Sequence, residues 1–195
     1  MNNNNIEKEN IFFQPRKVFL FSGHIIDNKS RKDIRFPEYK SKIAGEKILK
    51  VLAELSANEQ DLALTQGACG ADILFTEACQ LLGVKVIWLQ PFDEITFLEK
   101  SVKPCASTWQ KRYARCREKL YKNIHSLPQD NETTNPYEYC NRWLLSTALA
   151  YGNNKVSFIT LWDGKDADRP GGTGHMYKEV QDKVANIIWI HTDEL

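Results

Sequence analysis

The sequence lacks a long apolar run and an excess of either charge. None of its hydrophobic stretches approaches the roughly 20 residues that a membrane-spanning helix needs. The formal net charge is +1, which provides no global attraction for nucleic acid or for a membrane surface. We therefore expect neither a membrane protein nor a nucleic-acid-binding protein.

The sequence also lacks a cysteine pattern and an apolar leader. Its five cysteines are Cys69, Cys79, Cys105, Cys116 and Cys140, an odd number with no CxxC spacing. This arrangement argues against a disulfide framework or a zinc site, and for reduced thiols. The first ten residues are polar and contain no signal-peptide core, so we expect a cytoplasmic protein without a metal site.

What is present is the composition of one ordinary globular domain. The chain has 195 residues, of which 42% are hydrophobic and 26% are charged. Residues 2–9 are rich in asparagine and charge, so residues 1–14 are predicted to be a mobile tail and residues 15–195 a single domain. The sequence contains no internal repeat.

Apolar runs and helical stripes alternate along this domain. Strands are predicted at 17–21, 61–65, 84–89, 155–162 and 186–190. Helices are predicted from residue 37 to about 55, then at 71–82, 107–121 and 136–151, and from residue 174 to about 184. The alternation predicts an α/β fold: a Rossmann-like three-layer sandwich with a mostly parallel sheet.

Glycine-bearing loops follow three of the predicted strands, at residues 22–24, 67–72 and 170–174. In an open parallel sheet such loops converge on one crevice at the carboxyl ends of the strands, where ligands bind. The third loop contains Gly171, Gly172, Thr173 and Gly174, and no acid follows in the first helical turn. It is either a cradle for phosphate, made of backbone N–H groups, or a flexible turn capped by Thr173.

The second loop offers different chemistry, because Asp72 would repel a phosphate. Its carboxylate could accept hydrogen bonds from ribose hydroxyls or cap the helix. Gly67 and Gly70 would let the backbone approach the ligand. Cys69, near a helix N-terminus, is either an activated thiol or a small packing residue. Glu77, further along the helix, either reaches the crevice or is solvated.

The first loop carries Ser22, Gly23 and His24. With Asp27, His24 could form an acid–base pair or simply order the loop. Arg35 could bind phosphate or remain a solvated cation, and so could Arg31. Phe36 must be buried, which indicates an anchored loop. A further cation, Arg112, belongs to a basic predicted helix. Either the basic face of this helix is solvated, or Arg112 points into the crevice as an anion clamp.

The combined motifs resemble the SLOG superfamily, and most closely a bacterial subgroup often fused to signalling domains. The resemblance covers roughly residues 18–190. It rests on FSGHIID at 21–27, RFP at 35–37, GADILFTEA at 70–78, LQPF at 89–92, SV at 101–102, WQKRY at 109–113 and GGT at 171–173. It implies a Rossmann-like fold with a pocket for nucleotides or nucleotide-derived ligands.

One branch of this superfamily is enzymatic, the "lonely guy" phosphoribohydrolases, whose Pro-Gly-Gly-x-Gly-Thr segment is followed by paired glutamates. Here His175 replaces the threonine, and Tyr177 and Lys178 replace the glutamates. Glu179 comes one residue late, which turns a helical side chain by about 100°. The resemblance therefore favours binding over catalysis, with Asp72, Glu77 and Glu179 as the candidate catalytic carboxylates.

The expected function is binding of a nucleotide or an NAD- or ADP-ribose-derived ligand in bacterial signalling or defence, with no cofactor required. The alternative is an N-glycosidase or nucleoside monophosphate hydrolase that releases a base. A third alternative is an interaction module that uses the fold as a scaffold. A sensor needs an output, which would come from a homo-oligomer or from a separate effector protein.

Overall fold

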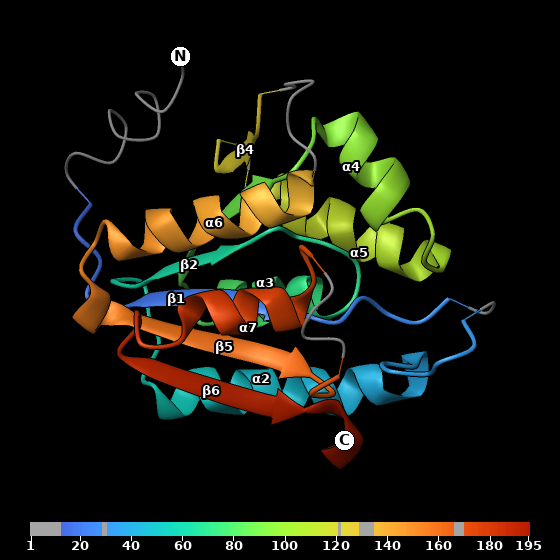
Figure 1. Ribbon diagram of the computed structural model, residues 1–195, viewed down its shortest axis with the longest axis horizontal. Helices are drawn as coiled ribbons and strands as arrows, with labels where there is room; N and C mark the ends of the chain where they lie inside the picture. The colour runs from blue at the N-terminus through green and yellow to red at the C-terminus, as the bar shows by residue number, and fades with distance from the viewer. Residues whose placement is uncertain (1–12, 29–30, 121, 129–134, 166–169) are drawn as a thin grey trace.

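Parallel strands form the centre of the molecule (Figure 1). The computed structural model describes residues 13–28, 31–120, 122–128, 135–165 and 170–195, and within these ranges the sheet has six strands in the order β4-β3-β2-β1-β5-β6. All five neighbouring pairs are parallel. The strands are β1 (Val18–Gly23), β2 (Leu62–Thr65), β3 (Lys85–Gln90), β4 (Ile124–Ser126), β5 (Val156–Trp162) and β6 (Asn186–His191).

Helices cover both faces of this sheet. In Figure 1, α6 and α7 lie in front of it, while α2 and α3 lie behind. Between β3 and β4 the chain forms α4 and α5. The bounds are α2 (Ser41–Glu54), α3 (Ala71–Leu81), α4 (Glu94–Ser101), α5 (Ser107–Glu118), α6 (Pro136–Leu149) and α7 (Thr173–Val180). The three-layer α/β class expected from the sequence is confirmed, with a sheet that is parallel throughout.

The strand sequences supply one hydrophobic core on each face, because alternate side chains of a strand point to opposite sides. In β1, Phe19 and Phe21 join the core shared with α2, α3 and α5. Val18 and Leu20 join the core shared with α6 and α7. This two-sided burial explains why the central strands are continuously apolar in sequence.

The strand order creates a crevice beside β1. From β1 the chain moves outward to β4 and then crosses to the other side of β1 to form β5. The connections after β1 and β5 therefore leave the sheet on opposite faces. In open α/β sheets this switch point is the usual place for a ligand.

Some details of the sequence-based assignment were wrong. The edge strand β4 was not predicted, because three half-exposed residues carry no alternating pattern. Phe36 is buried as expected. The predicted tail lies mostly outside the described residues, but Phe13, assigned to it, packs against the core on the α6 face.

The expectation of reduced thiols was also wrong for one pair. Cys69 and Cys105 form a disulfide, with their Cα atoms 6.7 Å apart and a sequence separation of 36. The fold brings the loop after β2 against the segment between α4 and α5, a proximity that cysteine spacing does not reveal. Cys79, Cys116 and Cys140 are free and buried.

Candidate functional site

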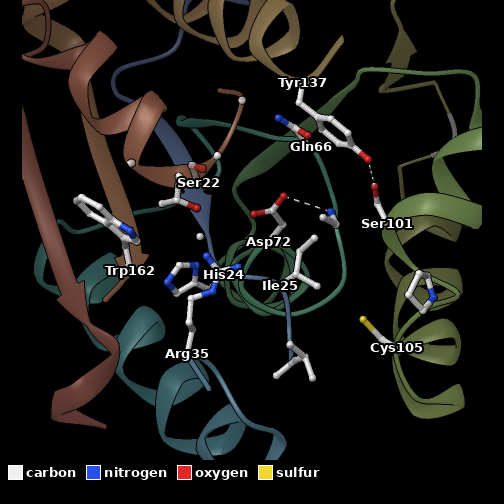
Figure 2. A pocket seen from close by; sticks show the side chains of 18 of the residues that line it. Ser22, His24, Ile25, Arg35, Gln66, Asp72, Ser101, Cys105, Tyr137 and Trp162 are labelled. Carbon is white, nitrogen blue, oxygen red and sulfur yellow. Dashed lines mark hydrogen bonds between the residues drawn. The ribbon is translucent and has the colours of Figure 1, made fainter. Parts of the chain in front are cut away.

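A cavity of about 450 Å³ opens at the carboxyl ends of the central strands (Figure 2). All three glycine-bearing loops contribute to its wall, together with the end of α4 and the start of α6. Nine of the residues singled out from the sequence line it. They are Ser22, Gly23, His24, Arg35, Asp72, Gly171, Gly172, Thr173 and Gly174. The predicted convergence of the loops is thus found in the structure.

The third loop opens α7 with its backbone exposed to the cavity. Gly172 is the N-cap residue, no side chain caps the helix, and the first turn contains no acid. Capping by Thr173 is therefore wrong. Gly171 has a φ of +76°, and a Cβ there would lie 2.6 Å from the Cβ of Tyr137. Only glycine fits this close approach to α6 without strain.

A chain of side-chain amides supports this loop. Gln66, at the cavity wall, donates through Nε2 to Oδ1 of Asn141 over 2.9 Å. Asn141 in turn donates through Nδ2 to the carbonyl oxygen of Gly172 over 3.4 Å. Asn141 is 1% exposed. Sequence reasoning missed it, although a polar residue inside the apolar face of a predicted helix was a usable signal.

Asp72 lies on the floor of the cavity rather than at a helix cap. The N-cap of α3 is Gly70, and the Asp72 carboxylate accepts a hydrogen bond from the backbone N–H of Ala68 over 3.2 Å (Figure 2). Asp72 is 6% exposed. Burial raises the pKa of its carboxyl to about 7, against the opposing effect of the hydrogen bonds from Ala68 and Thr65. This acid exchanges its proton near neutral pH.

The second loop packs directly on the first. Gly70 has a φ of +101°, and a Cβ at this position would lie 2.6 Å from the backbone nitrogen of Ile26. The N–H of Ala71 donates to the carbonyl oxygen of His24 over 3.0 Å. Gly67 and Gly70, expected to approach a ligand, do not line the cavity. Gly70 lets the two loops meet, whereas Gly67 packs against the ring of Trp88 on β3.

His24 has a different partner from the one predicted. Its Nε2 lies 3.0 Å from Oδ1 of Asp163 and 3.3 Å from the backbone nitrogen of Asp163. The two contacts are alternatives, since a protonated Nε2 donates to the carboxylate and an unprotonated one accepts from the N–H. Burial, followed by the nearby charge of Arg35, lowers the pKa of His24. The imidazole is therefore neutral at pH 7.

Asp27 holds the first loop together instead of pairing with His24. Its Oδ2 accepts the backbone N–H groups of Arg35 and Phe36 over 2.8 and 2.7 Å. Its Oδ1 lies 3.2 Å from Nε of Arg31. Asp27 does not line the cavity, but it orients the two arginines that do. The predicted His24–Asp27 pair is replaced by His24–Asp163. Asp163 comes 139 residues later in the chain, so the local sequence did not reveal this partner.

The charge around the cavity is predominantly positive. Among the described lining residues, one carries a carboxyl group, Asp72, and four carry a positive charge, namely Arg31, Arg35, Lys100 and Lys165. Lys100 also lies over the ring of Phe92, with Nζ 4.3 Å from the centroid. Arg31 also lies 3.2 Å from Asp27, and Lys165 lies 4.0 Å from Asp193, so part of this charge is balanced by carboxylates outside the cavity lining. The lining itself carries more cations than carboxyl groups, which favours anions.

Two aromatic residues face the cavity from different sides (Figure 2). Tyr137 comes from α6, and its hydroxyl oxygen lies 3.1 Å from Oγ of Ser101. Trp162 ends β5 and stacks on Trp189, with ring centroids 5.2 Å apart. Tyr177 completes this stack, 5.4 Å from Trp162. Such flat side chains can pack against a planar ring of a ligand.

Three predicted site residues lie elsewhere. Arg112 pairs with Glu77 through Nε and Oε1 over 2.9 Å, and its guanidinium stacks 4.2 Å from the ring of Trp109. This pair borders a separate groove between α2, α3 and α5. Glu179 pairs with Lys183 over 3.3 Å on α7. None of these three residues lines the cavity, so neither the anion clamp nor these two carboxylates belongs to it.

The described ranges contain no group of three or more His, Cys, Asp or Glu side chains that could hold a metal ion. No helix in the same ranges has both the length and the apolar character to cross a membrane. Cys69 does not line the cavity itself, but its disulfide partner Cys105 does.

Comparisons with known proteins give a likeness of fold. No family model and no curated protein matches the sequence. The solved structure of TM1055 is similar, with a TM-score of 0.43 and 12% identity over 91% of this chain and 95% of that one. DNA processing protein A (DprA) from Streptococcus pneumoniae has a TM-score of 0.42 and 15% identity over 91% of this chain. This chain spans 60% of the DprA chain.

The sheet order, the helical layers and the position of the cavity together define the architecture. The chain adopts the Rossmann-like fold, with its crevice at the strand ends, that the resemblance to the SLOG superfamily implied.

Proposed function

We propose that this protein binds a nucleotide, or a ligand derived from NAD or ADP-ribose, in the cavity beside β1. One observation carries the proposal: the uncapped, acid-free start of α7 borders a cavity ringed by four cationic side chains. Backbone N–H groups at a helix start and nearby cations are the usual recognition elements for phosphate. The volume of about 450 Å³ suits a small organic ligand.

Each part of such a ligand has a matching wall. The phosphates would contact residues 171–174, with Arg35 and Lys165 as counter-charges. The ribose would lie over Asp72, whose carboxyl can accept or donate a hydrogen bond near neutral pH. The base would pack against an aromatic ring, Trp162 or Tyr137. Ser22 and His24 of the first loop would close one side, so that the arrangement uses all three glycine-bearing loops.

The biological role that we propose is that of a sensor in bacterial signalling or defence. This part rests on the SLOG resemblance of the motifs at 21–27, 70–78 and 171–173. The output would be a change of homo-oligomeric state or the recruitment of a separate effector protein. Size-exclusion chromatography with and without ligand distinguishes a sensor from a passive scaffold, which would show no ligand-dependent change.

Isothermal titration calorimetry with AMP, ADP, NAD, ADP-ribose and cyclic nucleotides tests the binding proposal. We expect one site per chain and a preference for ligands with phosphate. Lys165→Gln should weaken binding about tenfold, the effect of losing one charge-assisted contact of about 1.4 kcal/mol. Lys111→Gln, an exposed lysine on α5 outside the cavity, is the matched control. Absence of binding by folded protein to every compound would refute the proposal.

A second function, hydrolysis of an N-glycosidic bond, is favoured by the raised pKa of Asp72. With a pKa of about 7, this buried carboxyl is partly ionised at neutral pH, and its ionised form can take a proton from an attacking water. Chromatography would then detect free base, and Asp72→Asn should abolish its release. Glu77→Gln and Glu179→Gln should retain it, since both residues lie outside the cavity. If a bound nucleotide persists unchanged, the protein is a binder and not a hydrolase.

A further inference from the structure

The Cys69–Cys105 disulfide connects two walls of the cavity. Cys69 belongs to the second glycine-bearing loop, between the wall residue Ala68 and the helix that carries Asp72. Cys105 belongs to the segment between α4 and α5 and itself lines the cavity. In Figure 2, Cys105 stands on this wall with its sulfur turned toward the middle of the view.

The two cysteines differ in their exposure. Cys69 is completely buried, whereas Cys105 is 8% exposed and borders the cavity. The neighbours of Cys105 in the chain, Lys103, Pro104 and Ala106, are exposed. A small thiol can therefore approach the disulfide from the side of Cys105. The free cysteines Cys79, Cys116 and Cys140 are buried away from such an approach.

Within the described part of the chain, few backbone hydrogen bonds join this wall to the second loop. The backbone N–H of Cys69 donates to the carbonyl oxygen of Ser101 over 3.0 Å. The hydroxyl of Ser101 contacts Tyr137. Lys100, Ser101 and Pro104, which present this wall to the cavity, lie within five residues of Cys105. Opening the disulfide would leave the wall held by these hydrogen bonds and by the buried side chain of Val102.

We propose that Cys105 is a site of thiol–disulfide exchange and that the Cys69–Cys105 bond is a redox latch on the ligand cavity. With the latch closed, the wall from Lys100 to Cys105 is preorganised for the ligand. With the latch open, the wall is loosened and the ligand binds more weakly, because ordering the wall then opposes binding. The effect on affinity rests on the proposed function, whereas the exchange chemistry and the loosening do not.

The exchange is balanced with a dithiol as the reductant. One thiolate of the dithiol attacks Sγ of Cys105, which forms a mixed disulfide and releases the thiolate of Cys69. The second thiol, as its thiolate, then attacks the reductant's own sulfur in the mixed disulfide and releases Cys105. The dithiol is oxidised to a cyclic disulfide, and two electrons and two protons pass to the protein. Cys69 precedes α3, whose N-terminal dipole stabilises the departing thiolate.

Counting thiols tests the bond itself. Purified protein, never exposed to reductant, is denatured, alkylated and digested, and its peptides are analysed by mass spectrometry. We expect three alkylated cysteines, Cys79, Cys116 and Cys140, and two more after treatment with dithiothreitol. Cys79→Ala, the control variant, should show two alkylated cysteines before reduction and two more after reduction. Five alkylated cysteines without reductant would overturn the proposal.

Hydrogen exchange tests the loosening. Amides in residues 67–71 and 98–106 should exchange at least about tenfold faster in reduced protein than in oxidised protein, while those of residues 109–116 on α5 should not change. Cys105→Ser should behave as the reduced form, and Cys79→Ala as the oxidised wild type. If Cys105→Ser does not fold, the comparison of oxidised with reduced wild-type protein decides alone. Equal exchange in both forms would overturn the latch.

Titration with ADP-ribose tests the coupling to binding. We expect about five- to tenfold weaker binding to the reduced protein and to Cys105→Ser, and unchanged binding to Cys79→Ala. By linkage, bound ADP-ribose should slow reduction by dithiothreitol. Equal affinities for the two forms would overturn the latch. If ADP-ribose binds neither form, that result counts against the proposed ligand class, and hydrogen exchange still decides the latch.

Discussion

At the scale of single residues, Asp72 determines how the protein responds to pH. Its pKa rises from 3.8 to about 7 on folding, so between these values the folded protein keeps a proton that the unfolded chain has lost. The contribution of Asp72 to stability is therefore fully present below pH 4 and is lost as the pH rises through 7. The loss is at most about 4 kcal/mol, at 1.36 kcal/mol for each pKa unit.

Asp72→Asn should remove this dependence. Urea unfolding at a series of pH values should show wild type losing stability relative to the variant from pH 4 to pH 8. The difference between the two proteins isolates Asp72 from His24, whose pKa is lowered and whose effect has the opposite sign. Asp33→Asn, in an exposed loop, controls for the loss of a carboxyl. A constant difference across the range would show that Asp72 does not titrate near neutral pH.

A second residue-scale prediction concerns Gly171. Gly171→Ala should lower the free energy of unfolding by about 3 kcal/mol and abolish ligand binding. The alanine would have to adopt a positive φ, and its Cβ would clash with Tyr137. Gly83→Ala is the matched control: its φ is +77°, but the nearest atom would be 3.7 Å from the Cβ. It should cost about 1 kcal/mol and leave binding intact. Equal effects of the two substitutions would show that φ strain alone matters at Gly171.

At this scale, a site residue could be predicted when its role depends on neighbours in sequence, and not when it depends on a residue far along the chain. His24 was identified because it follows β1 directly, and Asp72 because it lies at the end of the glycine-bearing loop after β2. The partner of His24 was not, because Asp163 follows a different strand and only the parallel pairing of β1 with β5 brings the two together. Arg112 was misplaced because helical periodicity gives a face of α5 without saying which neighbour it meets.

At the scale of elements, α6 is the support of the third loop. Asn141→Ala removes both hydrogen bonds that link Gln66 to Gly172. We expect unfolding free energy to fall by about 1–3 kcal/mol, the cost of leaving buried polar groups unsatisfied. Hydrogen exchange of residues 171–174 should accelerate. Ser146→Ala, exposed on the same helix, should change stability by less than about 0.5 kcal/mol. Unchanged exchange at 171–174 would remove α6 from this role.

The elements themselves were largely predictable, for a physical reason. A strand buried on both faces, such as β5, needs a continuous apolar run, which is visible in the sequence. Helices α2 and α3 need apolar stripes, and Gly70 and Gly83 mark the two ends of α3. The short strand β4 needs neither, because it pairs with β3 at the edge of the sheet. Its position is decided by tertiary contacts and could not be predicted locally.

At the scale of the whole molecule, ligand binding should raise thermal stability. A ligand at 100 times its Kd adds about 2.7 kcal/mol. For a chain of 195 residues this corresponds to a rise in Tm of about 5–10 °C. Differential scanning calorimetry with ADP-ribose measures it, and Lys165→Gln at the same ligand concentration should show a smaller rise. A ligand that binds by calorimetric titration without raising Tm would have to bind the unfolded chain equally well.

The aromatic stack beside the cavity gives the protein an optical signal of its own. Trp162 lines the cavity and lies 5.2 Å from Trp189, which is 42% exposed. Two indoles at this separation are coupled in their electronic transitions, so the near-ultraviolet circular dichroism should contain a paired band. A planar ring entering beside Trp162 would perturb that band and quench the fluorescence of one tryptophan more than the other. Occupancy of the cavity can thus be read without any added label.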